Sequence, residues 1–125
     1  MYYIEANPKY LSFLNAFFRA NSKGDFLIVT STITLLEVLV HPLRLLEVEL
    51  AQKYENILRN STGIELISTR AEIAVKAAEL RAKSGLRTPD AIQIATALWA
   101  GADYFLSNDK ELKRIKEIEV LMLSG

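Results

Sequence analysis

The chain has no cysteine among its 125 residues, and it has a single histidine, His41. The absence of cysteine excludes disulfide bonds, thiolate metal sites and cysteine nucleophiles, and it suits a reducing cytoplasm, where we expect the protein to act. His41 directly precedes Pro42, where a helix is expected to stop. We therefore interpret His41 as a cap or surface residue and look elsewhere for the chemistry.

The chain also lacks net charge, since 15 basic residues balance 15 acidic ones. Any nucleic-acid surface must therefore be a local patch. No apolar run approaches the roughly 20 residues that cross a bilayer, and the first residues do not resemble a secretion signal, so we expect no membrane partner. Because 50% of the residues are hydrophobic, the chain is long enough for one core, and we predict a single domain over residues 1–125.

Short apolar runs alternate with amphipathic segments, without a linker or an internal repeat. Strands are expected at 25–30, 64–68, 104–107 and 119–123, and helices at 7–21, 31–42, 43–60, 70–84 and 88–100. The strand segments are largely unalternating, which is typical of a parallel sheet covered on both faces. The pattern predicts an α/β fold, a three-layer α/β/α domain with a mainly parallel sheet.

Three carboxylates are expected at one edge of this sheet. Asp109 follows the strand at 104–107, Asp90 lies at the start of the helix at 88–100, and Glu37 lies near the start of the helix at 31–42. In parallel α/β units each crossover helix starts where a strand ends, so the three acids face one cleft.

Clustered carboxylates repel one another unless a cation neutralises them, and an all-oxygen set suits Mg²⁺ or Mn²⁺. Such a metal activates water and stabilises the charge on a phosphodiester, which predicts hydrolysis of nucleic acid. A simpler interpretation also remains open. Asp90 would then only favour the N-terminus of its helix, and Asp109 would only cap the segment that follows it.

Two segments, TSTITLLEVLVHP and LRTPDAIQIATALWAGADYFLSND, resemble the PIN domain family, in particular VapC-type toxins of toxin–antitoxin pairs. Residue by residue, Glu37, Asp90 and Asp109 match three of the four metal-site acids of that family. The resemblance implies a Mg²⁺- or Mn²⁺-dependent endoribonuclease, the toxin of such a pair, which hydrolyses RNA phosphodiesters. Its implied partners are RNA and an antitoxin protein.

Further polar residues are expected to support RNA binding. Ser107 and Asn108 match positions just before the last acid of the family, and Thr32 falls in its polar turn after the second strand. Arg87 lies close to the acids, where it could position phosphates. Gln93, one turn beyond Asp90, could orient water or substrate.

The chain departs from the family at its N-terminus. Family members usually begin with an apolar strand ending in Asp, whereas MYYIEANPKY looks like the end of the helix that follows that strand. The first strand and the first acid are therefore expected to be missing or replaced, and Glu5 is expected to lie away from the cleft. The central position would be filled by residues 1–5 folding back as a strand, by a segment from a second copy, or by direct rejoining of the two halves.

This departure predicts a site of three acids with weak metal binding and poor turnover. It leaves open a truncated or degenerate, non-catalytic PIN-like module that binds RNA or an antitoxin. A phospho-acceptor receiver domain is a third possibility, weakened because no paired acids follow an initial strand. Apolar side chains in helices 7–21 and 43–60 exceed what one core needs, which favours a homodimer or a complex with a helical antitoxin.

Overall fold

A parallel sheet of five strands forms the centre of the molecule. The computed structural model describes residues 2–5, 27–107 and 109–122, so the helix expected at 7–21 and Asn108 lie outside the described residues. The strands are β1 (Tyr2–Ile4), β2 (Ile28–Ser31), β3 (Ile64–Ile67), β4 (Tyr104–Ser107) and β5 (Glu119–Met122). Their order is β3-β2-β1-β4-β5, and every neighbouring pair is parallel. The predicted parallel α/β sheet is confirmed.

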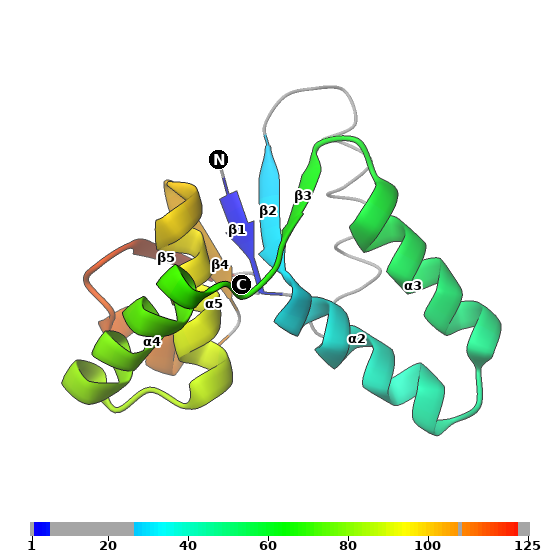
Figure 1. Cartoon of the computed structure of the whole chain (residues 1–125), viewed down its shortest axis with the longest axis horizontal. Helices are drawn as coiled ribbons and strands as arrows, with labels where there is room; N and C mark the ends of the chain where they lie inside the picture. The colour runs from blue at the N-terminus through cyan, green and yellow to red at the C-terminus, as the bar shows by residue number, and fades with distance from the viewer. Residues whose placement is uncertain (1, 6–26, 108, 123–125) are drawn as a thin grey trace.

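The central position of this sheet is occupied by β1, which lies between β2 and β4 (Figure 1). The interpretation that the first strand is missing is therefore wrong, and the first of the three alternatives, a strand formed by the opening residues, is the one observed. Backbone bonds attach the segment on both sides, from Tyr2 N to Leu27 O (2.9 Å) and from Glu5 N to Leu106 O (3.1 Å). Because β1 pairs with both β2 and β4, the backbone N–H and C=O groups that these strands direct toward the central position have hydrogen-bond partners.

Aromatic packing explains how a strand of three residues holds its register. The ring of Tyr2 stacks on Tyr104 with centroids 5.3 Å apart. On the opposite face, the ring of Tyr3 stacks on Phe105 at 5.0 Å, with the two planes only 7° apart. Each pair joins residues that face each other in the ladder between β1 and β4, so the ring contacts reinforce the backbone pairing.

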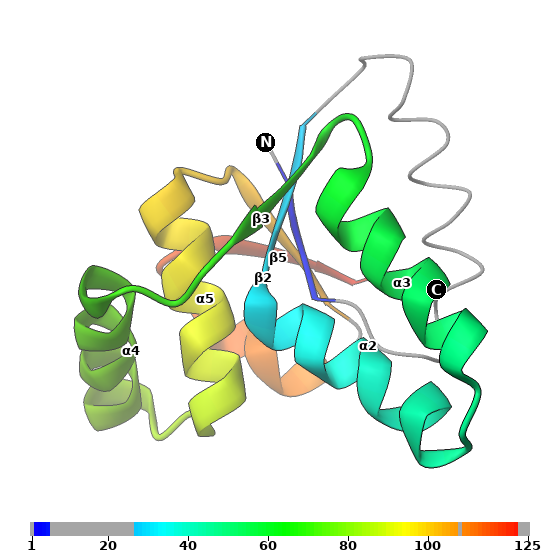
Figure 2. The same cartoon turned by 45° about the vertical axis from the view of Figure 1, so that its right-hand side comes forward.

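Helices cover both faces of the sheet (Figures 1 and 2). Alternate strand residues point to opposite faces, as expected from the pleat. Tyr3, Val29 and Phe105 belong to a core that includes residues of α4 (Ala71–Ser84) and α5 (Thr88–Ala100). Ile4, Ile28 and Leu106 belong to a second core with residues of α2 (Thr32–Arg44) and α3 (Val48–Asn60). The predicted three-layer α/β/α arrangement is confirmed.

The start of α2 is fixed by a side-chain cap. The hydroxyl of Ser31 accepts hydrogen bonds from the backbone N–H groups of Ile33 (3.1 Å) and Thr34 (3.4 Å). The predicted stop at Pro42 is wrong, because α2 continues to Arg44 with Pro42 inside its last turn. A proline near a helix end removes one intrahelical bond without breaking the turns before it. Within the described part of the chain, no helix has the length and apolar character needed to cross a membrane.

Candidate functional site

Four carboxylates lie where the strands end and the helices begin. Glu5 directly follows β1, and Asp109 follows β4 by two residues. Asp90 lies in the first turn of α5, and Glu37 is the sixth residue of α2. Because all strands are parallel, these positions belong to the same edge of the sheet. The structure thus places the three predicted acids at one edge and adds a fourth.

Glu5 is the residue that the sequence placed incorrectly. Its carboxylate Oε2 accepts a hydrogen bond from the hydroxyl of Ser107 at 3.1 Å, across the ladder between β1 and β4. Burial first, and then the negative charges of Asp90, Glu37 and Asp109, together raise the pKa of Glu5 to about 7, although the hydrogen bond from Ser107 lowers it in part. The expectation that Glu5 lies away from the cleft is therefore wrong, because its charge interacts with all three predicted acids.

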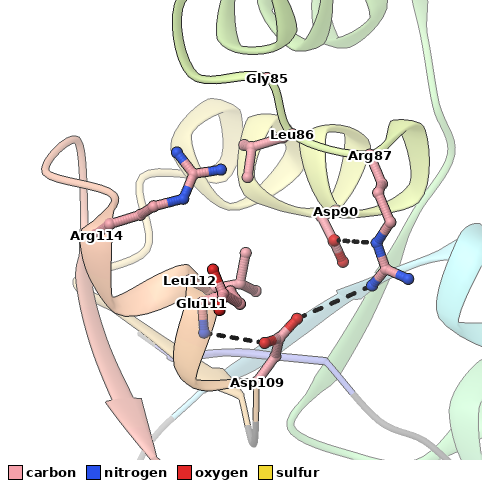
Figure 3. A pocket seen from close by; sticks show the side chains of 8 residues that line it. All are labelled: Gly85, Leu86, Arg87, Asp90, Asp109, Glu111, Leu112 and Arg114. Atoms are coloured by element: carbon pink, nitrogen blue, oxygen red, sulfur yellow. Dashed lines mark hydrogen bonds and ion pairs between the residues drawn. The ribbon is translucent and has the colours of Figure 1, made fainter.

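An arginine connects two of the acids (Figure 3). Arg87 Nε lies 3.0 Å from Asp90 Oδ2, and Arg87 Nη2 lies 3.9 Å from Asp109 Oδ2. The side chain of Asp90 is only 7% exposed, whereas that of Arg87 is 75% exposed. The guanidinium thus reaches from solvent over two acids, and the ion pair with Asp90 raises the pKa of Arg87. A cation already neutralises part of the cluster.

The two oxygens of Asp109 have separate contacts. Oδ1 accepts a hydrogen bond from the backbone N–H of Glu111 at 3.0 Å and so caps the short 3₁₀ helix η2 (Lys110–Arg114). Oδ2 is the atom nearest to Arg87. The simple capping role is therefore real, but it occupies one oxygen and leaves the other directed toward the cluster (Figure 3).

A cavity of about 340 Å³ lies beside this ion pair (Figure 3). Its walls come from the end of α4, the start of α5 and the segment after β4, and the lining residues are Gly85, Leu86, Arg87, Asp90, Asp109, Glu111, Leu112 and Arg114. The two arginines and three acids that line the cavity suit a ligand that carries negative charge together with a cation.

The fourth member of the cluster, Glu37 on α2, contacts a residue of α5. Its Oε1 accepts a long hydrogen bond of 3.5 Å from Gln93 Nε2. Burial and the charge of Asp90 raise the pKa of Glu37, and the positive charge of Arg87 lowers it in part. Glu37 therefore interacts electrostatically with Asp90, although the two residues lie on different helices.

Ser107 connects the ends of β1 and β4. It donates its hydroxyl hydrogen to Glu5, as described above, and its oxygen accepts the backbone N–H of Asp109 at 3.0 Å. This residue is fully buried, so its two bonds are not exposed to competing water. Thr32, the first residue of α2, lies at the same edge of the sheet.

The chemistry of these side chains fits a hard divalent cation. Their donors are carboxylate oxygens, burial and mutual repulsion raise the pKa of Glu5 and of Glu37, and a guanidinium already lies between Asp90 and Asp109. In the arrangement described for residues 2–5, 27–107 and 109–122, no three acidic or histidine side chains are close enough to hold one ion. Shared ligation of one ion would therefore need these carboxylates to come closer together than they lie here.

Besides Glu5, sequence reasoning missed Tyr3 and Thr34, whose hydroxyls contact Gln93. One available signal was the pattern at the N-terminus, where an apolar run is followed at once by an acid, as occurs near Asp109. No comparable signal marks Tyr3 and Thr34, because residues of a buried polar network look like core positions in a sequence.

Comparison with solved structures shows the same fold in toxin–antitoxin proteins. VapBC2 from Rickettsia felis, bound to a DNA fragment from its promoter, matches with a TM-score of 0.75 and 21% identity, over 99% of this chain and 100% of that one. A toxin–antitoxin complex from Klebsiella pneumoniae gives 0.68 and 21%, over 97% and 96%. VapC20 from Mycobacterium tuberculosis, a sarcin–ricin loop cleaving toxin, gives 0.64 and 17%, over 95% and 99%.

A comparison with curated proteins gives no match. The family model of the PIN domain matches residues 9–118, which is most of the chain and includes Glu37, Asp90 and Asp109. Together with the sheet order, this match identifies the chain as a member of the PIN domain family.

Proposed function

We propose that this protein is a metal-dependent endoribonuclease that acts in the cytoplasm as the toxin of a toxin–antitoxin pair. The observation that carries the proposal is the convergence of Glu5, Glu37, Asp90 and Asp109 at one edge of the sheet, where burial and then the charges of the other acids raise the pKa of Glu5 to about 7. Such crowding of carboxylates is costly without a cation. The PIN family match and the fold shared with toxin–antitoxin proteins support the same conclusion.

Glu5, Glu37, Asp90 and Asp109 would hold Mg²⁺ or Mn²⁺. When bound, the metal supplies an activated water and stabilises the charge that develops on the phosphodiester. Ser107 keeps Glu5 directed toward the cluster through its 3.1 Å hydrogen bond. The fourth acid supports a catalytic site over a degenerate, non-catalytic module, because that alternative was inferred from a missing first acid.

Arg87 is proposed to contact the RNA backbone once the acids release it. The side chain of Arg87 is mostly exposed and lines the cavity, as does that of Arg114. Arginine suits phosphate because its planar donors form two parallel hydrogen bonds. The mutual attraction of Arg87 and the acids would also hold the site closed to other anions in the metal-free state.

Replacing Asp109 with asparagine should abolish Mn²⁺-dependent RNA cleavage and weaken Mn²⁺ binding, because the change removes one charge from the cation site. Isothermal titration calorimetry measures Mn²⁺ binding, and a fluorophore-quencher RNA measures cleavage. Asp90→Asn should behave in the same way. Arg87→Gln should retain Mn²⁺ binding but bind RNA more weakly, with a salt dependence reduced by about one counterion.

The matched control is Asp103→Asn, since Asp103 is exposed and lies before β4, whereas Asp109 lies after it. This control should bind Mn²⁺ and cleave RNA as the natural protein does. Full activity in both Asp90→Asn and Asp109→Asn would show that cleavage does not depend on these two carboxylates. Metal binding without cleavage of any RNA would support a binding module instead.

An antitoxin is the proposed protein partner, and a homodimer is proposed in addition. Six large apolar side chains are exposed on α2, on α3 and on the turn between them, namely Leu36, Val40, Leu43, Leu45, Leu46 and Val48. Exposed apolar surface of this kind marks interaction sites. We name these six residues the apolar arm, which extends away from the sheet in Figure 1.

Replacing Leu46 in the apolar arm with aspartate should weaken antitoxin binding by at least about tenfold, because a charge would be buried in the interface. Leu46 is 84% exposed in this chain, so the free protein should keep its stability. Val75→Asp is the control, because Val75 is 61% exposed on α4, outside the arm. Co-expression with the protein of the adjacent gene, followed by affinity measurement, tests both variants. If Leu46→Asp and Val75→Asp bind the antitoxin with equal affinity, the antitoxin binds outside the apolar arm.

A further inference from the structure

A buried hydrogen-bond network links the core of the sheet to Glu37. The phenol of Tyr3 donates to Gln93 Oε1 at 2.6 Å, and the hydroxyl of Thr34 donates to the same oxygen at 3.0 Å. Tyr3 and Thr34 are 0% exposed, and Gln93 is 1% exposed. The network joins β1, which Glu5 directly follows, to α2 and α5, which carry Glu37 and Asp90.

The two hydroxyl donors determine which way the amide of Gln93 points. With Oε1 occupied by both hydroxyls, the Nε2 group is directed at Glu37 Oε1, 3.5 Å away. In the reversed orientation the amide oxygen would face the carboxylate of Glu37, and two acceptors would repel each other. The orientation that satisfies every group is therefore the one that presents a donor to Glu37.

Gln93 also has no direct route to RNA. A side chain that is 1% exposed cannot contact a substrate in solution, so the sequence-based expectation that it orients water or substrate is not supported by its placement. Its polar contacts lead inward to Tyr3 and Thr34 and outward only to Glu37.

We propose that Gln93 is a positioning residue, which Tyr3 and Thr34 hold so that its amide keeps the carboxylate of Glu37 directed toward the metal site. The inference rests on the proposed metal-dependent function. Residues that orient metal ligands in this way affect metal affinity without binding the metal, typically by 10- to 100-fold. The network also makes the position of Glu37 depend on β1 being in place.

The test compares isosteric changes that remove one hydroxyl. Thr34→Val removes a donor to Gln93, so its Mn²⁺ affinity, measured by calorimetry, should fall by about tenfold. Thr34→Ser keeps a hydroxyl at this position, so its Mn²⁺ affinity should be close to that of the natural protein. Tyr3→Phe removes the other donor, keeps the ring, and should weaken Mn²⁺ binding similarly. It provides the same test should Thr34→Val fail to fold.

Thr96→Val is the matched control. Thr96 is also 0% exposed and lies on α5, but its hydroxyl donates only to the backbone oxygen of Ile92 at 2.7 Å. The Mn²⁺ affinity of Thr96→Val should therefore equal that of the natural protein. A second readout is the side-chain amide resonance of Gln93 in the metal-free protein, which should shift in Glu37→Gln and in Thr34→Val but not in Thr96→Val.

The outcomes separate the two proposals. If the natural protein binds no Mn²⁺, the proposed function fails and this inference fails with it. If the natural protein binds Mn²⁺ and both Thr34→Val and Tyr3→Phe bind it equally well, only the positioning role of Gln93 is wrong. An equal loss of affinity in Thr96→Val would show that the effect is one of general stability and would also overturn the inference.

Discussion

Replacing Glu5 with glutamine should lower Mn²⁺-dependent RNA cleavage by roughly 100-fold, because it removes one of four charges from the cation site. In the metal-free protein the same change should be stabilising above pH 7. There Glu5 is charged, largely buried and repelled by the charges of Asp90, Glu37 and Asp109, whereas glutamine is uncharged and keeps an oxygen that can accept the hydrogen bond from Ser107. Loss of function together with a gain in stability is typical of a residue that serves a ligand.

The pH dependence of this gain follows from the raised pKa. Burial and like charges raise the pKa of Glu5 in the folded state to about 7, from 4.5. The folded state therefore binds more protons than the unfolded state between these two values, so the natural metal-free protein loses stability as the pH rises through this window. The total loss is on the order of 3 kcal/mol, and it is nearly absent below pH 4.5.

Urea unfolding of the natural protein and of Glu5→Gln at pH 4.5 and pH 8, without metal, measures this difference. The two curves should nearly coincide at the lower pH and separate at the higher one. Glu65→Gln, at an exposed position of β3, is the control and should follow the natural protein at both values. A Glu5→Gln variant that is less stable than the natural protein at pH 8 would contradict carboxylate crowding at this position.

Much of the fold could be predicted because its signals are local. The strand at 104–107 is observed with the same bounds, and the helix at 88–100 ends at Gly101, whose φ of +74° suits glycine. The common edge of Asp90 and Asp109 followed from the handedness and order of parallel βα units alone. Residues placed by topology were therefore placed correctly, although their metal role is still a proposal.

Strand β1 could not be predicted from the same kind of signal. Three residues are too few to show a period, and the resemblance to the PIN family aligned the opening residues with a helix. What makes Tyr2–Ile4 a strand is tertiary, since two neighbouring ladders and two stacked ring pairs surround it. Glu5 depends on β1 for its position. Because β1 was not predicted, Glu5 was not predicted as part of the site either. The predicted weak metal binding then loses its basis.

Replacing Tyr3 with alanine should lower the free energy of unfolding by about 3–5 kcal/mol, the usual cost of removing a large aromatic side chain from a core. Tyr3 is 0% exposed, stacks on Phe105 and donates to Gln93, so alanine leaves both a cavity and an amide with one donor fewer. Tyr3→Phe keeps the ring and should cost only about 1–3 kcal/mol, since it removes one buried hydrogen bond.

Tyr2→Ala is the comparison on the same strand, because Tyr2 is only half-buried and stacks on Tyr104 on the opposite face. Its cost should be well below that of Tyr3→Ala. Urea unfolding curves give all three values. A loss below about 1 kcal/mol for Tyr3→Ala would mean that β1 is not part of the core. If the expected loss is found, β1 is both the centre of the sheet and the support of Glu5, so a variant that disrupts β1 should lose fold stability and activity together.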